Sequence, residues 1–476
     1  MRPYSRIFFA IAFLILSTFL FLVPLRAQKP AAGHLLVLSN VTVVDVRTGA
    51  LRPDQTVILE GHHIASITPS KSAKYSGDAR RVNCRGLFLI PGLWDMHVHL
   101  AFGDWFPGAQ EISLQLFVAN GVTGVRDMGS ELDIVQGWRN DIEAGRLVGP
   151  RIYTSGPMLD GPTPRFPSSI AVTTPEDGRR AVADLKRRGA DFIKLQSLIP
   201  RDAVFAIAEE ARKEEIPFEG HVPDSVRASE MSAAGMKSFE HLIGIFEGSS
   251  AAEDDFLKGK KTEGRFLATY DAPRAASLAA TLAKNQTWQC PTLVWERGGN
   301  LIDVTDFGKD TRAKYVPASW KTKTWKRFTD EIIQGYGTDD LPTRKKFLDK
   351  ELEVVGMLHK TGVRFLAGTD TPAGVYVFPG FSLHEELQRF MAAGFSPLEA
   401  LQIATINPAR FFGLENQLGA IEKGRLADLV LLSANPLEDI ANTQKIAGVV
   451  VNGRYFNRAE LDQMLGRVEA AARRQR

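Results

Sequence analysis

The sequence predicts an α/β protein: a TIM barrel of eight β/α units, with a small β-sandwich domain that the two ends of the chain build together. Three observations lead to this prediction. Short apolar runs alternate with helical segments through the middle of the chain, β-rich runs lie at both ends, and polar side chains close several of the central runs. At 476 residues the chain is long enough for one large barrel with an appendage.

The first residues are typical of a secretory signal peptide. Arg2 and Arg6 precede an apolar stretch, residues 7–23, and the small residue Ala27 follows at a suitable cleavage site. We therefore expect residues 1–27 to be a signal peptide and the mature protein to be exported, to the periplasm or the extracellular space. The alternative is an uncleaved membrane anchor, because the apolar run approaches the length of a membrane span.

Both ends of the remaining chain are rich in strand-forming residues separated by turns. The runs are residues 35–38, 41–44, 57–61, 64–67, 427–432 and 449–454. We expect residues 34–88 and 415–458 to form one composite β-sandwich domain. Residues 89–414 would then form the barrel between its two halves.

Apolar strands alternate with helices in the middle of the chain, as in β/α units around a parallel sheet. The candidate strands end near His97, Arg126, Ser155, Lys194, His221, His241, Val294 and Asp370. Helices are expected at residues 203–213 and 343–360. The polar stretch of residues 298–341 looks like an insertion, either a lid or a solvated excursion.

Charge and cysteine content limit the partners. The net charge is +3 and the basic residues are dispersed, which argues against a nucleic-acid-binding surface and favours a small-molecule substrate. Cys84 and Cys290 fall in different predicted domains, so we expect two buried free thiols rather than a disulfide. The sequence leaves a homo-oligomer open, and only an uncleaved signal segment would contact a membrane.

His97 and His99 are the most informative pair in the chain. They are spaced i, i+2 at the end of an apolar run, so their side chains point the same way from an extended backbone and can reach one metal ion. His221, His241 and Asp370 close other predicted strands, at the barrel face where active sites lie. One such histidine is usually structural, but the whole set indicates a metal site.

Lys194 also closes a predicted strand, after Phe192 and Ile193. Its ordinary role would be that of a solvated or ion-paired lysine, because an ammonium group has no lone pair for a metal. A lysine with a lowered pKa can instead react with carbon dioxide to form a carbamate. The two oxygens of that anion could bridge two metal ions.

The chain resembles the amidohydrolase superfamily, in the branch of imidazolonepropionase-related enzymes, Xaa-Pro dipeptidases and N-acyl-amino-acid hydrolases. The motifs that carry the resemblance are residues 91–99, 124–127, 191–194, 240–241, 368–370, 396–401, 404–409 and 424–430. The resemblance implies that His97, His99 and Asp370 hold one metal. It also implies that His221 and His241 hold a second metal.

The resemblance further implies that carboxylated Lys194 and a hydroxide bridge two divalent ions, with Zn²⁺ suiting the mixed nitrogen and oxygen ligands best. Asp370 would move a proton from the hydroxide to the leaving nitrogen. The expected reaction is hydrolysis of an amide in a dipeptide or an N-acyl amino acid.

Two alternatives remain. One is a mononuclear enzyme that opens a cyclic amide or deaminates a ring, and the other is an inactive binding scaffold. The loops at residues 156–164 and 222–224 depart from the relatives' pattern, so the substrate stays open. His384, at the head of a predicted helix, is expected to have a helix-packing role rather than to contact the substrate. Arg126 is expected either to bind a substrate carboxylate or to pair with Asp127.

Overall fold

The structure, a computed structural model, describes residues 35–259 and 261–475. The predicted signal peptide, residues 1–27, lies outside the described residues, as does the first residue of the predicted composite domain.

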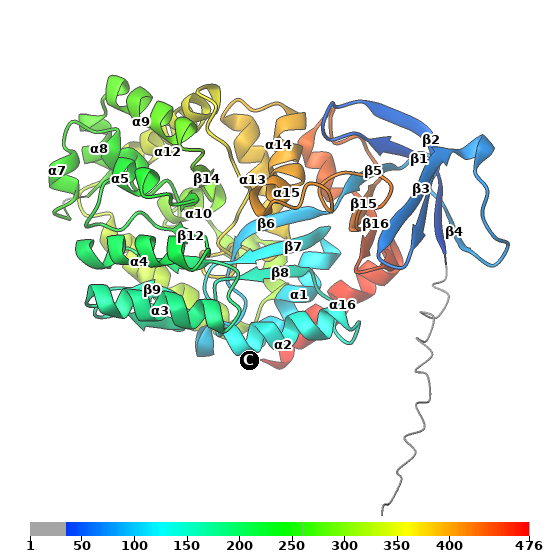
Figure 1. The fold of residues 1–476 in the computed structure, drawn as a ribbon, viewed down its shortest axis with the longest axis horizontal. Helices are drawn as coiled ribbons and strands as arrows, with labels where there is room; N and C mark the ends of the chain where they lie inside the picture. The colour runs from blue at the N-terminus through cyan, green and yellow to red at the C-terminus, as the bar shows by residue number, and fades with distance from the viewer. Residues whose placement is uncertain (1–34, 260, 476) are drawn as a thin grey trace, which may run out of the picture.

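One eight-stranded sheet joins the two ends of the chain, at the right of Figure 1. Its strands are β1 (Leu36–Val44), β2 (Leu51–Glu60), β3 (His63–Pro69), β4 (Arg80–Asn83), β5 (Phe88–Pro91), β15 (Leu429–Leu432), β16 (Ile446–Val451) and β17 (Arg454–Asn457). The strand order is β17-β16-β15-β5-β1-β2-β3, with β4 beside β1. The halves meet where β5 pairs antiparallel with β15, Pro91 opposite Leu429. A two-layered sandwich stays a prediction.

The middle of the chain forms two parallel sheets. One contains β6 (Leu93–Val98), β7 (Val122–Asp127) and β8 (Arg151–Thr154). The other contains β9 (Met158–Asp160), β10 (Ser169–Ala171), β11 (Ile193–Leu195), β12 (Phe218–Gly220), β13 (Ser238–Glu240) and β14 (Trp288–Cys290). Every residue of β6 and β7 is buried, as expected for parallel strands covered on both faces.

Residues 363–371 lie between the two parallel sheets without forming a regular strand. The Leu366 amide donates to the Gln289 carbonyl of β14, and the Ala367 carbonyl accepts from the Met96 amide of β6. Isolated parallel bridges pair Phe365 with Gln289 and Thr371 with Val98. The strand predicted to end at Asp370 is therefore irregular, although it occupies the expected place.

Helices cover the parallel sheets, as Figure 1 shows for α3 and α4. The helices are α1 (Ala109–Ala119), α2 (Leu132–Glu143), α3 (Pro175–Arg187), α4 (Arg201–Lys213), α5 (Ala228–Ala233), α6 (Ile245–Gly248), α7 (Glu253–Phe256), α8 (Glu263–Thr269), α9 (Ala272–Lys284), α10 (Leu293–Asn300), α11 (Lys326–Gly335), α12 (Leu341–Lys360), α13 (Phe381–Ala392), α14 (Pro397–Ile403), α15 (Ile406–Phe412) and α16 (Arg458–Arg474). The two helices predicted at 203–213 and 343–360 are confirmed as α4 and α12. The unpredicted α16 packs along α1.

The seventh predicted strand ends earlier than expected. It was placed up to about Val294, but β14 ends at Cys290 and α10 begins at Leu293. The backbone turns at Thr292, which has a left-handed φ of 50°. The Glu386 carboxylate then accepts from the amides of Leu293 and Val294, which have no partner within the helix.

Part of the insertion (residues 298–341) is packed onto the protein, whereas much of residues 303–309 is exposed. Trp320 and Trp325 are fully buried. Their indole N–H groups donate to the carbonyls of Pro107 (2.9 Å) and Pro372 (2.8 Å). Buried aromatic rings and their indole hydrogen bonds therefore help to hold this segment in place.

Cys84 and Cys290 are free and buried, which confirms the prediction of two thiols. Within residues 35–259 and 261–475, we find no helix with the length and apolar character needed to span a bilayer.

Candidate metal centre

Three of the predicted ligands converge where β6 meets the irregular segment. His97 and His99 lie at the end of β6, and Asp370 turns toward them with a left-handed φ of 62°. Asp370 Oδ1 lies 3.4 Å from His97 Nε2 and 3.1 Å from His99 Nε2. One ligand atom from each residue lies within 4.8 Å of the others, which is close enough for one ion. All three side chains are buried.

The hydrogen bonds of His97 and His99 leave the lone pairs of their Nε2 atoms free to face Asp370. His97 Nδ1 contacts the Glu240 carboxylate (2.7 Å), and His99 Nδ1 contacts the Gly129 carbonyl (3.0 Å). Both partners can only accept, so each Nδ1 carries the proton and each Nε2 is bare. His97 Nε2 and Asp370 Oδ1 are buried without a hydrogen-bond partner. Lone pairs facing one another without a proton fit a cation.

His221 and His241 lie beside this group at the ends of β12 and β13, with their ring centroids 5.1 Å apart. The ring of His241 is also 4.5 Å from that of His97. Their Nδ1 atoms are hydrogen-bonded to the hydroxyls of Ser197 (2.9 Å) and Thr292 (2.6 Å). Among the described residues, these two histidines belong to no close group of three ligand-type atoms.

Burial holds the pKa of His97, His221 and His241 well below the ordinary value of histidine, and the nearby Lys194 charge lowers each further. Neutral imidazoles are the form that binds a metal.

Lys194 lies in the middle of β11, fully buried, and its Nζ has no hydrogen-bond partner. Gly220 makes room for the side chain, since a Cβ there would come within 2.7 Å of Lys194 Cδ. Burial lowers the pKa of Lys194 to about 8, although the carboxylates of Glu240 and Asp370 oppose the shift. A buried, unpartnered amine beside histidines and a carboxylate is suited to carbamate formation.

Arg126 has neither of its predicted roles. It is fully buried, so it cannot meet a substrate, and its guanidinium pairs with Glu219 (2.5 Å) and Glu240 (2.8 Å) instead of Asp127. Asp127 instead accepts hydrogen bonds from Ser130 and Thr154. A buried guanidinium held between two carboxylates is satisfied by its partners.

Glu240 is a functional residue that reasoning from the sequence missed. Its carboxylate joins Arg126 to His97 Nδ1 and so fixes the orientation of that imidazole. Its position directly before His241, at the end of the same strand, was the available signal.

A second group of ligand-type atoms, His97, Glu240 and Cys290, lies nearby and is a poorer metal site. His97 Nδ1 and Glu240 already bond to each other. Burial raises the pKa of the Cys290 thiol well above its usual value, so the thiolate that a metal needs is disfavoured.

A cavity of about 260 Å³ opens onto Asp370. Its lining includes Trp295 of α10 and Phe328 of the insertion. The ring of Trp295 lies 5.1 Å from that of His241, which places the cavity beside the histidines.

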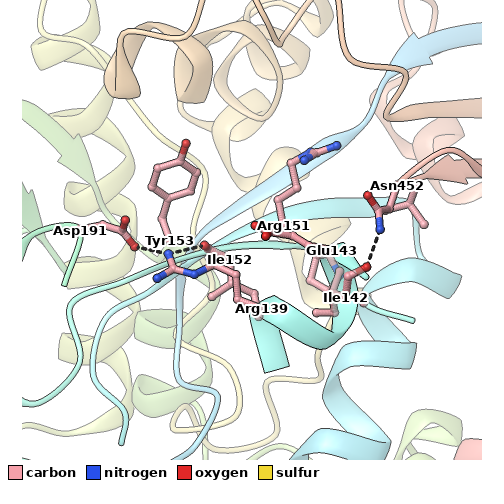
Figure 2. Close-up of a pocket in the computed structure, with 11 residues that line it drawn as sticks. Arg139, Ile142, Glu143, Arg151, Ile152, Tyr153, Asp191 and Asn452 are labelled. Atoms are coloured by element: carbon pink, nitrogen blue, oxygen red, sulfur yellow. Dashed lines mark hydrogen bonds and ion pairs between the residues drawn. The ribbon is translucent and has the colours of Figure 1, made fainter. Parts of the chain in front are cut away.

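Another cavity, of about 180 Å³, lies away from these ligands, around the start of β8. Figure 2 shows Arg139 between the Asp191 carboxylate and the Ile152 carbonyl, with Asn452 turned toward the Ile142 carbonyl. These polar groups are paired with one another, and the start of a parallel strand faces away from the usual active-site end. We assign this cavity no function.

The comparison with known proteins agrees with the geometry. A model of the amidohydrolase family matches residues 88–455, most of the chain. The chain belongs to the amidohydrolase family. Membership of this family and the curated relatives identify the chain as a hydrolase that acts on carbon–nitrogen bonds.

Two curated relatives and one solved structure illustrate the range of similarity. An ochratoxinase from Aspergillus niger is 26% identical over 429 residues, covering 77% of this chain and 75% of the relative. An adenine deaminase from Paracoccus denitrificans is 41% identical over 420 residues, covering 86% of this chain and 56% of the relative. A Xaa-Pro dipeptidase structure with bound methionine superposes with a TM-score of 0.66 at 19% identity, covering 89% of this chain and all of the other.

Proposed function

We propose that this amidohydrolase is an exported, metal-dependent enzyme that cleaves the amide bond of a dipeptide or an N-acyl amino acid. The observation that carries the proposal is the close group of His97, His99 and Asp370, in which His97 Nε2 and Asp370 Oδ1 are buried without a hydrogen-bond partner. The unpartnered amine of Lys194 is buried nearby. The ochratoxinase and dipeptidase relatives support amide cleavage.

The proposal includes two divalent metal ions. His97, His99 and Asp370 would hold one, His221 and His241 the other, and Lys194 in its carbamate form would contact both. Bound metals, zinc being the best match to these ligands, lower the pKa of water and polarise the scissile carbonyl.

Residues of the chain would then orient a metal ligand and transfer a proton. Glu240 keeps the Nε2 lone pair of His97 directed at the centre by accepting from Nδ1. The Asp370 carboxylate, which lines the cavity, would accept a proton from the attacking water and deliver it to the leaving nitrogen.

We also propose the finer architecture: a closed barrel of eight strands with a composite sandwich at its side. Residues 363–371 would be the last barrel strand, supported by their hydrogen bonds to both β14 and β6.

Export is proposed from the sequence of residues 1–27 alone. Sequencing the N-terminus of the protein from the extracytoplasmic fraction tests it. A start near residue 28 supports cleavage, and an intact N-terminus in the membrane fraction would favour the anchor.

The alternative is a mononuclear deaminase or cyclic-amide hydrolase, which the adenine deaminase relative favours. Such enzymes lack a bridging lysine, so the burial of Lys194 without a partner speaks for the binuclear form.

Metal content per chain distinguishes the two. We expect elemental analysis of the full protein, purified with zinc and bicarbonate, to give about two metals, falling to one or none in Lys194→Ala, because the bridging ligand is lost. Lys237→Ala is the matched control: Lys237 is a half-buried lysine whose pKa burial also lowers, but it precedes β13, at the strand end away from His241. If the wild type and Lys194→Ala both contain one metal per chain, the proposal of a binuclear centre is overturned.

A further inference from the structure

The cavity of about 260 Å³ that opens onto Asp370 is lined mostly by apolar residues. Phe166, Trp295 and Phe328 supply aromatic walls, and they come from the loop after β9, from α10 and from the insertion. Aromatic walls of this kind suit an apolar or aromatic side chain of a substrate.

Its rim carries a single positive charge. Among the described residues that line this cavity, Arg165 is the only cationic one. The guanidinium lies 5.2 Å from the centroid of the Phe166 ring and contacts the carboxylate of Glu331, on α11. The Arg165 side chain therefore links the loop after β9 to the insertion across the cavity.

This ion pair is exposed, with 52% of the Arg165 side chain and 35% of the Glu331 side chain accessible to solvent. Exposed pairs of this kind add little to stability, and water screens them. A planar guanidinium nevertheless binds a carboxylate well, so another carboxylate can exchange with that of Glu331.

We infer that Arg165 binds the free carboxylate of the substrate and that this carboxylate displaces Glu331 from it. The inference rests on the proposed function, because dipeptides and N-acyl amino acids both carry a free carboxylate close to the scissile amide. The preferred substrates would have that carboxylate and an apolar, preferably aromatic, side chain.

Two variants distinguish between two roles of Arg165: an anchor that binds the substrate carboxylate, and a purely structural link between the loop after β9 and the insertion. Both Arg165→Met and Glu331→Gln break the Arg165–Glu331 ion pair, and Glu331→Gln also removes the carboxylate that Arg327 contacts on the same helix (2.9 Å). A purely structural role therefore predicts that both variants impair the enzyme. An anchor predicts opposite effects, because Glu331→Gln removes a competitor while Arg165→Met removes the binding group.

The first measurement compares N-acetylphenylalanine with its C-terminal amide on the metal-loaded enzyme. We expect kcat/KM to favour the acid by about tenfold or more in the wild type. Arg165→Met should abolish this preference mainly through KM, and Glu331→Gln should keep or increase it. Equal rates for acid and amide, or an equal loss in both variants, would overturn the inference.

The second measurement does not depend on turnover. Calorimetry follows the binding of the same two compounds to the full chain treated with a chelator. The inference is supported if the wild type binds the acid more tightly than the amide, Arg165→Met removes this preference and Glu331→Gln retains it. This holds even if the enzyme cleaves no amide. Absence of cleavage would count against the proposed function alone. Equal binding of acid and amide, or no binding of either, counts against Arg165 as the anchor.

N-acetylglycine tests the aromatic walls. It leaves them unfilled, so we expect it to bind about tenfold more weakly than N-acetylphenylalanine. Equal binding of the two would overturn the assignment of an aromatic side chain to this cavity.

Discussion

At the scale of single residues, Arg126 has two carboxylate partners with different neighbours. Glu240 bonds to both Arg126 and His97. The side chain of Glu219 bonds to Arg126 and, within the described part of the chain, forms no hydrogen bond or ion pair with a predicted ligand, although its backbone lies beside that of Lys194 in the β11–β12 ladder. A hydrogen-bond acceptor on the remote nitrogen of a metal-binding imidazole fixes its orientation and raises its basicity. The two glutamates therefore offer a matched comparison.

Glu240→Gln is expected to weaken metal binding by about 10- to 100-fold, because an amide orients His97 less strongly than a carboxylate does. Chelator competition measures the affinity. Glu219→Gln is the control: it also removes one carboxylate from Arg126 but leaves His97 untouched, so its metal affinity should stay close to that of the wild type. Equal losses in both variants would show that the ion pair, rather than the histidine contact, matters.

At the scale of structural elements, the irregular segment of residues 363–371 packs unusually tightly against its neighbours. A Cβ at Gly368 would lie 2.5 Å from Cys290 Sγ and 2.7 Å from His97 Cβ. Glycine at this position lets the segment approach β6 and β14, and so brings Asp370 to the histidines.

Gly368→Ala is therefore expected to destabilise the protein by about 1–3 kcal/mol and to weaken metal binding, because His97 or the segment must shift. Urea unfolding and chelator competition measure the two effects. Gly335→Ala, at the end of α11 where a Cβ meets nothing within 4 Å, should be neutral or slightly stabilising. A Gly368→Ala protein with wild-type stability and metal affinity would contradict the close-packing argument.

At the scale of the whole molecule, His384 joins parts that are far apart in the sequence. It is buried in α13, as predicted, and its Nε2 contacts the Asn120 carbonyl (3.1 Å). Its Nδ1 contacts the hydroxyl of Thr443, between β15 and β16 of the terminal sheet (2.9 Å). The Asn120 carbonyl can only accept, so Nε2 carries the proton of the neutral ring. The Thr443 hydroxyl also contacts the Ile440 carbonyl (2.8 Å), so its one proton is shared between that carbonyl and Nδ1.

This buried histidine makes stability depend on pH. Burial lowers the pKa of His384 to about 4 from its ordinary value of 6.5. Between these values the unfolded chain binds a proton that the folded chain does not, so the contribution of His384 is complete above pH 6.5 and is lost as pH falls toward 4. The expected loss is about 2 kcal/mol on going from about pH 7.5 to about pH 4.5.

Urea unfolding at both pH values tests this expectation. His384→Gln should lose about 2 kcal/mol less than the wild type between them. His62→Gln, at an exposed position in the turn between β2 and β3, should keep the wild-type pH dependence. An unchanged pH dependence in His384→Gln would show that His384 does not carry the effect.

The sequence by itself determined the alternation of strands and helices in the middle of the chain and which histidines lie at the ends of strands. The two-residue period of His97 and His99 and the apolar runs before His221 and His241 are local properties, so they can be read along the chain. The same local reasoning identified α4 and α12. It also singled out Lys194, which follows an apolar run in the sequence and is fully buried in the structure.

Only the tertiary structure decided what these residues contact. The bond between His97 and Glu240 joins β6 to β13, and Arg126 finds its carboxylates on β12 and β13. Likewise, the packing of Trp320 and Trp325 depends on backbone carbonyls of distant segments. Periodicity records which face of an element a residue occupies but not which distant element meets that face, so such contacts arise only when the chain is folded.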